Sequence, residues 1–188
     1  MRRREFLAAT GAVAAGALLE RSALAADAKG GDDRPNILII ITDQQFSGAM
    51  SCAIGRDYIH TPNMDSLAEA GTRFTRAYCA NPLCVPSRSA MFTGRFCHEV
   101  GIQSNSRDKL DPDRFPCLGR LFKDAGYETG FFGKWHMPYD VKKKADHGFD
   151  TVSGRPCIYD GRPAAEFVAK PRSRPFLAVA SFMNPHNI

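Results

Sequence analysis

The chain has 188 residues, a formal net charge of +5 and 44% hydrophobic residues, which is enough apolar material for one domain with a buried core. The positive excess is small and scattered, so the sequence gives no reason to expect a nucleic acid as partner. The six cysteines are irregularly spaced and include no Cys-x-x-Cys pair, which argues against a zinc ribbon or a dithiol redox motif. Whether they pair in disulfides stays open.

Residues 1–25 have the pattern of an export signal. Three arginines at 2–4 precede an apolar run at 6–19, and Ala-Leu-Ala at 23–25 provides a cleavage site. The run is shorter than the ~20 residues of a spanning helix, which favours a cleaved signal over a membrane anchor. The Arg-Arg-x-Phe-Leu form is typical of bacterial twin-arginine signals. We therefore expect the twin-arginine export machinery as a partner, a periplasmic or secreted location, and a disordered polar leader at 26–35.

Strand and helix patterns alternate along the rest of the chain. They predict strands at 36–42, 72–78, 127–135 and 175–183, and helices at 61–70, 86–92 and 117–125. The first strand is a continuous β-branched run, which is typical of a strand buried on both faces of a parallel sheet. Residues 96–115 are expected to be mostly loop, and 138–174 show no clear periodicity. The alternation predicts an α/β fold with a mainly parallel sheet.

Polar side chains follow three of these strands. Asp43 and Gln44 come after the first strand, Lys134 and His136 lie at the end of the third, and His186 follows the last. Each signal alone is weak, because a single Asp after a strand is more often a turn or helix cap. Ligands bind beyond the carboxyl ends of parallel strands, so the joint occurrence predicts that these side chains meet at one site.

A resemblance to a known family rests on the stretch Cys84-Val-Pro-Ser-Arg88, which is followed by Thr-Gly-Arg at 93–95. This stretch resembles the signature C-x-P-S-R…T-G-R of the type I sulfatases, formylglycine-dependent enzymes of the alkaline-phosphatase-like superfamily. Segments around Asp43, Lys134 and His186 resemble further motifs of the family, in the family's order. The resemblance implies an α/β fold with a mainly parallel central sheet flanked by helices.

The same resemblance implies a covalent mechanism. In this family a formylglycine-generating enzyme oxidises the motif cysteine, here Cys84, to an aldehyde. The hydrated aldehyde attacks the sulfur of a sulfate ester, the alcohol leaves, and the second hydroxyl then expels sulfate. The expected activity is therefore sulfate ester hydrolysis, with a sulfated glycan or a small sulfate ester as substrate.

The family motifs also imply a metal site. Asp43, the side-chain oxygen of Gln44 and the modified Cys84 would hold a divalent cation. Oxygen ligands favour Ca²⁺, with Mg²⁺ or Mn²⁺ as alternatives. The family often has Asp where this chain has Gln44, so the charge at the site would be lower.

The remaining roles follow from the resemblance and from the negative charge of a sulfate ester, which needs cations in place. Arg88 would orient the diol, Lys134 would bind a sulfate oxygen, and His136 would accept the proton that lets sulfate leave. His186 and Asn105 are candidate substrate contacts.

Family members are much longer, so residues 36–188 resemble the N-terminal part of a catalytic domain that is incomplete at its C-terminus. The later metal ligands of the family would lie beyond Ile188. Residues 26–188 alone are therefore expected to be inactive or unstable, with one sheet edge unpaired. Two alternatives stay open: a phosphonate or phosphate ester hydrolase of the same superfamily, and an inactive truncated fragment.

Overall fold

The computed structural model describes residues 32–106 and 108–186. The chain divides into two compact units, Met1–Arg34 and Pro35–Ile188. In the first unit the structure describes only 32–34, where Arg34 forms an ion pair with Asp32. The expected export signal and most of the expected leader therefore lie outside the described residues and stay predictions.

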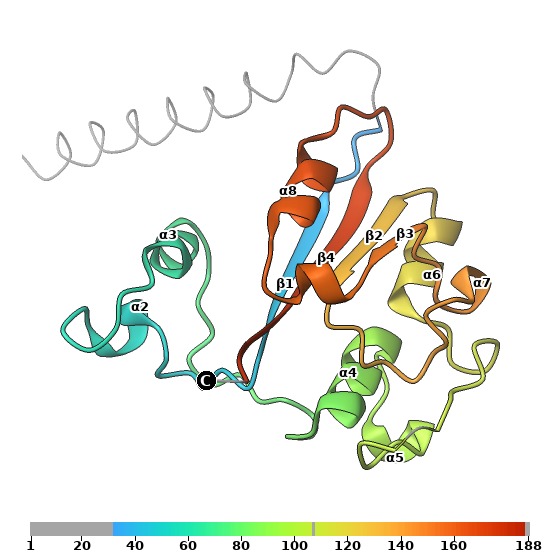
Figure 1. Cartoon of the computed structure of the whole chain (residues 1–188), viewed down its shortest axis with the longest axis horizontal. Helices are drawn as coiled ribbons and strands as arrows, with labels where there is room; N and C mark the ends of the chain where they lie inside the picture. Colours follow the sequence, from blue (N-terminus) through green and yellow to red (C-terminus); the bar gives the residue numbers. More distant parts are fainter. Residues whose placement is uncertain (1–31, 107, 187–188) are drawn as a thin grey trace, which may run out of the picture. The chain divides into compact units, whose positions relative to one another are not determined.

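The second unit is built on a four-stranded parallel sheet (Figure 1). Its strands are β1 (Ile37–Asp43), β2 (Glu128–Gly133), β3 (Thr151–Ser153) and β4 (Phe176–Pro185). Their order is β1-β4-β2-β3, so the strand that comes last in the chain lies between the first two. This arrangement confirms the expected α/β fold with a parallel sheet.

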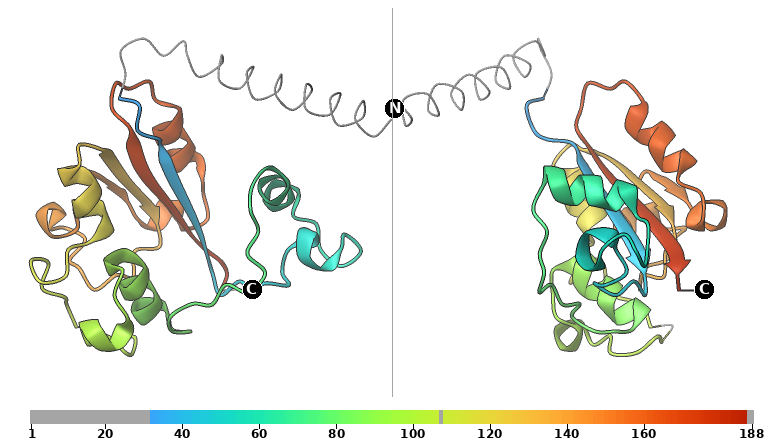
Figure 2. Two further views of the ribbon diagram at one scale, coloured as in Figure 1. Left: turned by 180° about the vertical axis from the view of Figure 1, so that it is seen from behind. Right: turned by 90° about the vertical axis from the view of Figure 1, so that its left-hand side faces the viewer.

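Helices lie on both faces of the sheet, because parallel strands need crossover connections (Figures 1 and 2). One face carries α4 (Cys84–Thr93) and α6 (Leu118–Asp124), and the other carries α8 (Arg162–Ala169) and a 3₁₀ helix, η1 (Arg155–Ile158). The remaining described helices are α2 (Ser51–Ile54), α3 (Pro62–Ala70), α5 (Cys97–Val100) and α7 (Lys144–His147). Within the described segments, no helix combines the length and apolarity needed to cross a membrane.

The alternation of side chains along a strand creates two cores. Phe131 of β2 is fully buried in the larger core, where its ring contacts Phe92 of α4 at 5.9 Å between centroids. The next residue, Phe132, lies on the opposite face with Ala164 of α8 and Ala180 of β4. The sheet therefore has α4 and α6 packed on one side and α8 on the other.

The expected strand at 72–78 is wrong. The segment has no strand or helix, and its residues are all exposed. A strand persists only where its backbone pairs with a neighbour. The four-stranded sheet that the structure describes gives this segment no partner.

The expectation that β1 is buried on both faces is also wrong. Ile39 and Ile41 pack against the larger core, but Leu38 and Ile40 are 45% and 52% exposed. In the described part of the sheet β1 is an edge strand, and Leu38 and Ile40 line an apolar groove of about 350 Å³ together with residues of α8.

The other expected elements form with small shifts. The expected helix at 61–70 corresponds to α3, with Thr61 at its N-cap and Pro62 in the first turn. The helix expected at 86–92 begins earlier, at Cys84. The segment 138–174 contains α7, β3, η1 and α8, which the sequence did not reveal because each has eight residues or fewer. All six cysteines are free thiols.

Candidate active site

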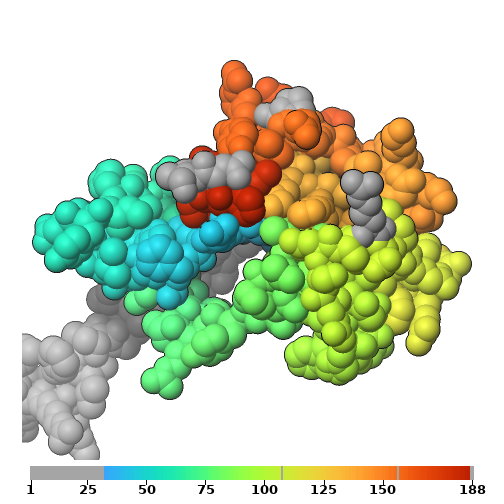
Figure 3. All heavy atoms as spheres, turned by 60° about the horizontal axis from the view of Figure 1, so that its bottom comes forward, coloured from blue at the N-terminus to red at the C-terminus, as the bar shows by residue number. Residues whose placement is uncertain are grey.

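The carboxyl ends of three neighbouring strands bring the expected site residues together. Asp43 is the last residue of β1, Lys134 follows β2, and His186 follows β4. The register aligns these ends, since Asp43 pairs with Pro185 and Gly133 pairs with Ser181. Figure 3 looks toward this end of the sheet, where the blue, red and orange segments adjoin.

Helix α4 presents Cys84 at its first position. Pro86 fits the first turn of a helix because this turn does not need its N–H group. The side-chain oxygen of Asn105 accepts a hydrogen bond of 3.0 Å from the Val85 N–H, which satisfies one free donor of the helix end. The helix ends at Thr93, and the C-cap residue Gly94 has a left-handed φ of 65° and donates its N–H to the Ala90 carbonyl. Asn105 thus supports the helix that begins at Cys84, and its expected substrate contact stays a prediction.

The Asp43 carboxylate is at the centre of the cluster. Lys134 Nζ lies 2.5 Å from Asp43 Oδ2, and Arg88 Nη2 lies 3.4 Å from the same oxygen. Lys134 Nζ also lies 3.5 Å from Cys84 Sγ, and this thiol lies 3.9 Å from Asp43 Oδ1. The Cys84 thiol is therefore within reach of one carboxylate and one ammonium group.

Burial and charge act against each other on these groups. Burial raises the pKa of Asp43, but Lys134 and Arg88 more than offset it and hold the pKa below its usual range. Burial lowers the pKa of Arg88, and the attraction of Asp43 opposes this shift. The carboxylate is therefore ionised at neutral pH, and the arginine keeps its charge.

His136 lies beside this cluster with its side chain accessible to solvent. Desolvation, then the charges of Lys134 and Arg88, lower its pKa from the usual value. The imidazole is thus neutral at pH 7 and able to accept a proton. Among the described residues other than glycine, only Gln44 and His136 have positive φ, at 61° and 43°. Both of these strained positions border the site.

Three potential metal ligands converge here. One donor atom each of Asp43, Cys84 and His186 lies within 4.8 Å of the others. Gln44, which is exposed, lines the same cavity of about 430 Å³. The oxygen donors of Asp43 and Gln44 suit a hard cation, and converting Cys84 to an aldehyde would replace its sulfur with oxygen. The residues therefore fit the expected divalent ion.

From the sequence, His186 is expected to contact the substrate and not the metal. Its place directly after a strand is a signal for the site, but the pairing of β4 with β1 is not visible in the sequence. His136 lies in an adjoining cavity of about 390 Å³, which shares Asn105 with the first.

Comparisons with known proteins agree with this geometry. Residues 35–163 match the family model described as Sulfatase. The chain is 45% identical over 105 residues to an N-acetylglucosamine-6-O-sulfatase of Bacteroides thetaiotaomicron, a match that covers 55% of this chain and 18% of the relative. It is 32% identical over 181 residues to a Delta 4,5-hexuronate-2-O-sulfatase of the same bacterium, covering 88% and 37%.

A solved structure of BT4656 in complex with its substrate D-glucosamine-2-N,6-O-disulfate superimposes with a TM-score of 0.68 at 30% identity. The match covers 82% of this chain and 35% of that one, so the chain spans well under half the length of these relatives. Since the family model matches more than half of the residues, the chain belongs to the sulfatase family and adopts part of its alkaline-phosphatase-like fold.

Proposed function

We propose that the protein hydrolyses sulfate esters of sugars or glycans, with a formylglycine made from Cys84 as the nucleophile. The observation that carries the proposal is the position of Cys84. It occupies the first turn of α4, with Lys134 at 3.5 Å and the Asp43 carboxylate beside it. The sugar sulfatases among the relatives support a sulfated sugar as the substrate class.

The chemistry assigns each residue a task. One hydroxyl of the hydrated aldehyde gives up its proton and forms a bond to sulfur while the bond from sulfur to the alcohol oxygen breaks, and the alcohol oxygen takes up one proton as it leaves. Lys134 would bind a sulfate oxygen and compensate the charge of the incoming anion. His136, neutral at pH 7, would then take the proton of the second hydroxyl, so that the carbon–oxygen bond to sulfate breaks and the aldehyde re-forms.

A divalent cation would supply positive charge at the nucleophile's oxygen. Asp43, Gln44 and the modified residue 84 would hold it, with His186 close enough to contribute. Ca²⁺ is our first choice because it accepts oxygen ligands in flexible geometry, and Mg²⁺ and Mn²⁺ are the alternatives. Arg88 would orient the diol through its buried guanidinium.

The motif around Cys84 further suggests a formylglycine-generating enzyme as partner, acting before folding is complete. The twin-arginine pattern at 2–4 fits this order of events, because that machinery exports proteins already folded in the cytoplasm. We propose a periplasmic or secreted location on this basis.

The test is to produce the full natural protein together with a formylglycine-generating enzyme. Mass spectrometry of the Cys84 peptide should show conversion of the thiol to the aldehyde. The protein should then release sulfate from p-nitrophenyl sulfate and from 6-O-sulfated glucosamine, and Cys84→Ala should abolish both activities.

The alternative function is hydrolysis of phosphate or phosphonate esters, since other members of the same superfamily could act on such substrates. Assays with matched phosphate and phosphonate esters distinguish it from sulfate ester hydrolysis. Faster cleavage of those esters would replace the sulfatase assignment. An intact thiol in a host that contains the modifying enzyme would favour the inactive fragment.

A further inference from the structure

A buried serine connects two of the cationic residues of the site. Ser181 lies in β4 and is completely buried. Its backbone pairs with Gly133 of β2 on one side and with Ile41 of β1 on the other. Ser181 therefore lies on the central one of these three strands, close to the carboxyl ends that carry the site residues.

The Ser181 hydroxyl makes two hydrogen bonds of 2.9 Å. It donates to the backbone carbonyl of Lys134 and accepts from Nη1 of Arg88. Arg88 Nη1 also donates to the Lys134 carbonyl at 2.9 Å, so the three groups form a closed triangle. Both hydrogens of Nη1 are thereby used, and Nη2 is left to meet Asp43 at 3.4 Å.

The three hydrogen bonds matter because the Arg88 guanidinium is buried. Arg88 is only 3% exposed, and a buried guanidinium needs a partner for each N–H that water cannot reach. The two bonds of Nη1 fix the plane of the guanidinium. They therefore determine where Nη2 lies relative to the carboxylate.

The main chain of Ser181 also holds Lys134. The Lys134 N–H donates to the Ser181 carbonyl at 2.8 Å. A Cβ added to Gly133 would lie 2.0 Å from that same carbonyl oxygen, so the close approach depends on glycine. Ser181 thus contacts the Lys134 backbone through both its carbonyl and its hydroxyl.

We propose that Ser181 is a positioning residue of the reaction, which acts by orienting Arg88 and the backbone of Lys134. Its catalytic consequence rests on the proposed sulfatase function, whereas its effect on the Arg88 guanidinium does not. The Ser181 hydroxyl acts through Arg88 and Lys134 and not directly on the substrate or the nucleophile.

The first test is Ser181→Ala in the full natural protein, with Ser89→Ala as the matched control. Ser89 is equally buried, but its hydroxyl bonds only the Val85 carbonyl within α4. NMR of ¹⁵N-arginine-labelled protein should show resolved, slowly exchanging Nη protons for Arg88 in the wild type and in Ser89→Ala. These signals, assigned with Arg88→Lys, should average or disappear in Ser181→Ala.

The second test is kinetic. Ser181→Ala should lower kcat about 10- to 100-fold with KM changed less than about 3-fold, because the interaction acts on the reacting groups and not on substrate binding. In an Arg88→Lys background the same change should cost less than about 3-fold, since the hydroxyl has already lost its guanidinium partner and keeps only its bond to the Lys134 carbonyl. A merely structural serine would cost the same in both backgrounds.

Wild-type Arg88 signals and a kcat within about 2-fold in Ser181→Ala would overturn the proposal. If Ser181→Ala does not fold, Ser181→Cys gives the same NMR comparison with a weaker donor and a similar shape. A wild-type protein without sulfate ester hydrolysis would refute the proposed function, while the NMR comparison would still decide the role of Ser181.

Discussion

The ammonium group of Lys134 lies 2.5 Å from the Asp43 carboxylate, and the side chains of both residues are about nine-tenths buried. The pair connects the ends of β2 and β1, two strands that do not touch, across β4 between them. A buried pair of this kind keeps one positive charge beside Cys84, the proposed nucleophile, before any substrate arrives. Preorganised charge of this type needs no rearrangement during the reaction.

Replacement of Lys134 by alanine should therefore lower kcat by about 10²- to 10³-fold, as expected for loss of a preorganised donor. Lys142→Ala, which changes an exposed lysine, is the control and should leave kcat unchanged. The measurement is steady-state hydrolysis of a sulfate ester by protein with equal formylglycine content. Equal rates for the two variants would contradict the role given to Lys134.

Metal binding gives a second prediction. Chelation should remove activity, and added Ca²⁺ should restore it. His186→Gln should weaken Ca²⁺ binding at least about tenfold, because His186 lies within 4.8 Å of the other two donor atoms. Calorimetric titration of the metal-free protein measures this directly. The control is His98→Gln, an exposed histidine stacked on Phe96, and equal affinities in both variants would exclude His186 as a ligand.

Much of this site was predictable from sequence because its residues lie in short motifs directly after strands. Asp43, Lys134 and His186 each follow an apolar run, and parallel strands bring such positions to one edge. The positioning role of Ser181 was not predictable. It depends on the order β1-β4-β2, which places β4 between two strands that precede it in the chain.

The errors in the fold have a related cause. The segment 72–78 contains residues that favour strands, such as Phe74, Thr75 and Tyr78, but pairing is decided by partners far away in the sequence. Leu38 and Ile40 match a doubly buried strand in type, yet burial depends on what lies beside β1. Local pattern gives a preference for strand, and the neighbours determine whether a strand forms and which face is covered.

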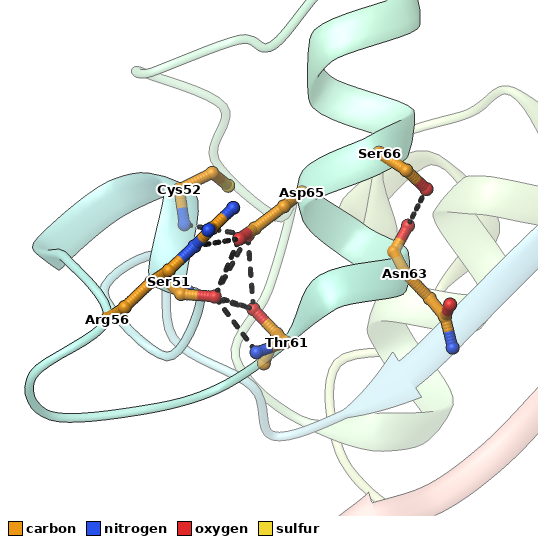
Figure 4. A network of polar contacts seen from close by, with 7 residues as sticks. All are labelled: Ser51, Cys52, Arg56, Thr61, Asn63, Asp65 and Ser66. Atoms are coloured by element: carbon orange, nitrogen blue, oxygen red, sulfur yellow. Dashed lines mark hydrogen bonds and ion pairs between the residues drawn. The ribbon is translucent and has the colours of Figure 1, made fainter.

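The network around Asp65 should make stability depend on pH (Figure 4). The carboxylate accepts bonds from the Ser51 hydroxyl at 2.9 and 3.0 Å, from the Cys52 N–H at 2.8 Å and from the Thr61 hydroxyl at 3.4 Å. Burial raises the pKa of Asp65, but these bonds and then Arg56 outweigh it, so the pKa is lowered. The stabilisation is present above the unfolded pKa of about 3.9 and is lost as pH falls through the folded value.

Asp65→Asn should accordingly lower the urea midpoint at pH 7 and flatten the loss of stability between about pH 5 and pH 2. Asp57→Asn, at an exposed position between the same two helices, should match the wild type at both ends of the range. Urea unfolding followed at several pH values provides the comparison. A steep acid loss that persists in Asp65→Asn would assign the pH dependence to other groups.

The aromatic cluster should dominate the stability of the larger core. Phe131 is fully buried and its ring lies 4.9 Å from Trp135 and 5.3 Å from Phe149. Phe131→Ala should cost about 3–5 kcal/mol of unfolding free energy, because it removes these contacts and leaves a cavity. Tyr58→Ala, at an aromatic side chain that is 82% exposed, should cost less than about 0.5 kcal/mol. Urea unfolding of the two variants tests the difference.

Two glycines separate the effect of backbone conformation from the effect of crowding at the site. Gly55 and Gly133 have φ of 93° and 105°, but an added Cβ meets nothing within 4 Å at Gly55 and lies 2.0 Å from the Ser181 carbonyl oxygen at Gly133. Gly55→Ala should therefore cost only the conformational penalty, about 1–3 kcal/mol. Gly133→Ala should cost about 1–3 kcal/mol more, because β2 and β4 must move apart.

The same shift would displace the Lys134 backbone that Ser181 holds. Gly133→Ala should thus also lower kcat in the fraction that remains folded, while Gly55→Ala should keep wild-type kcat. Unfolding by urea and kinetics on the folded protein measure the two effects separately. A Gly133→Ala variant as stable and as active as Gly55→Ala would show that the sheet can absorb the extra methyl group without moving the site.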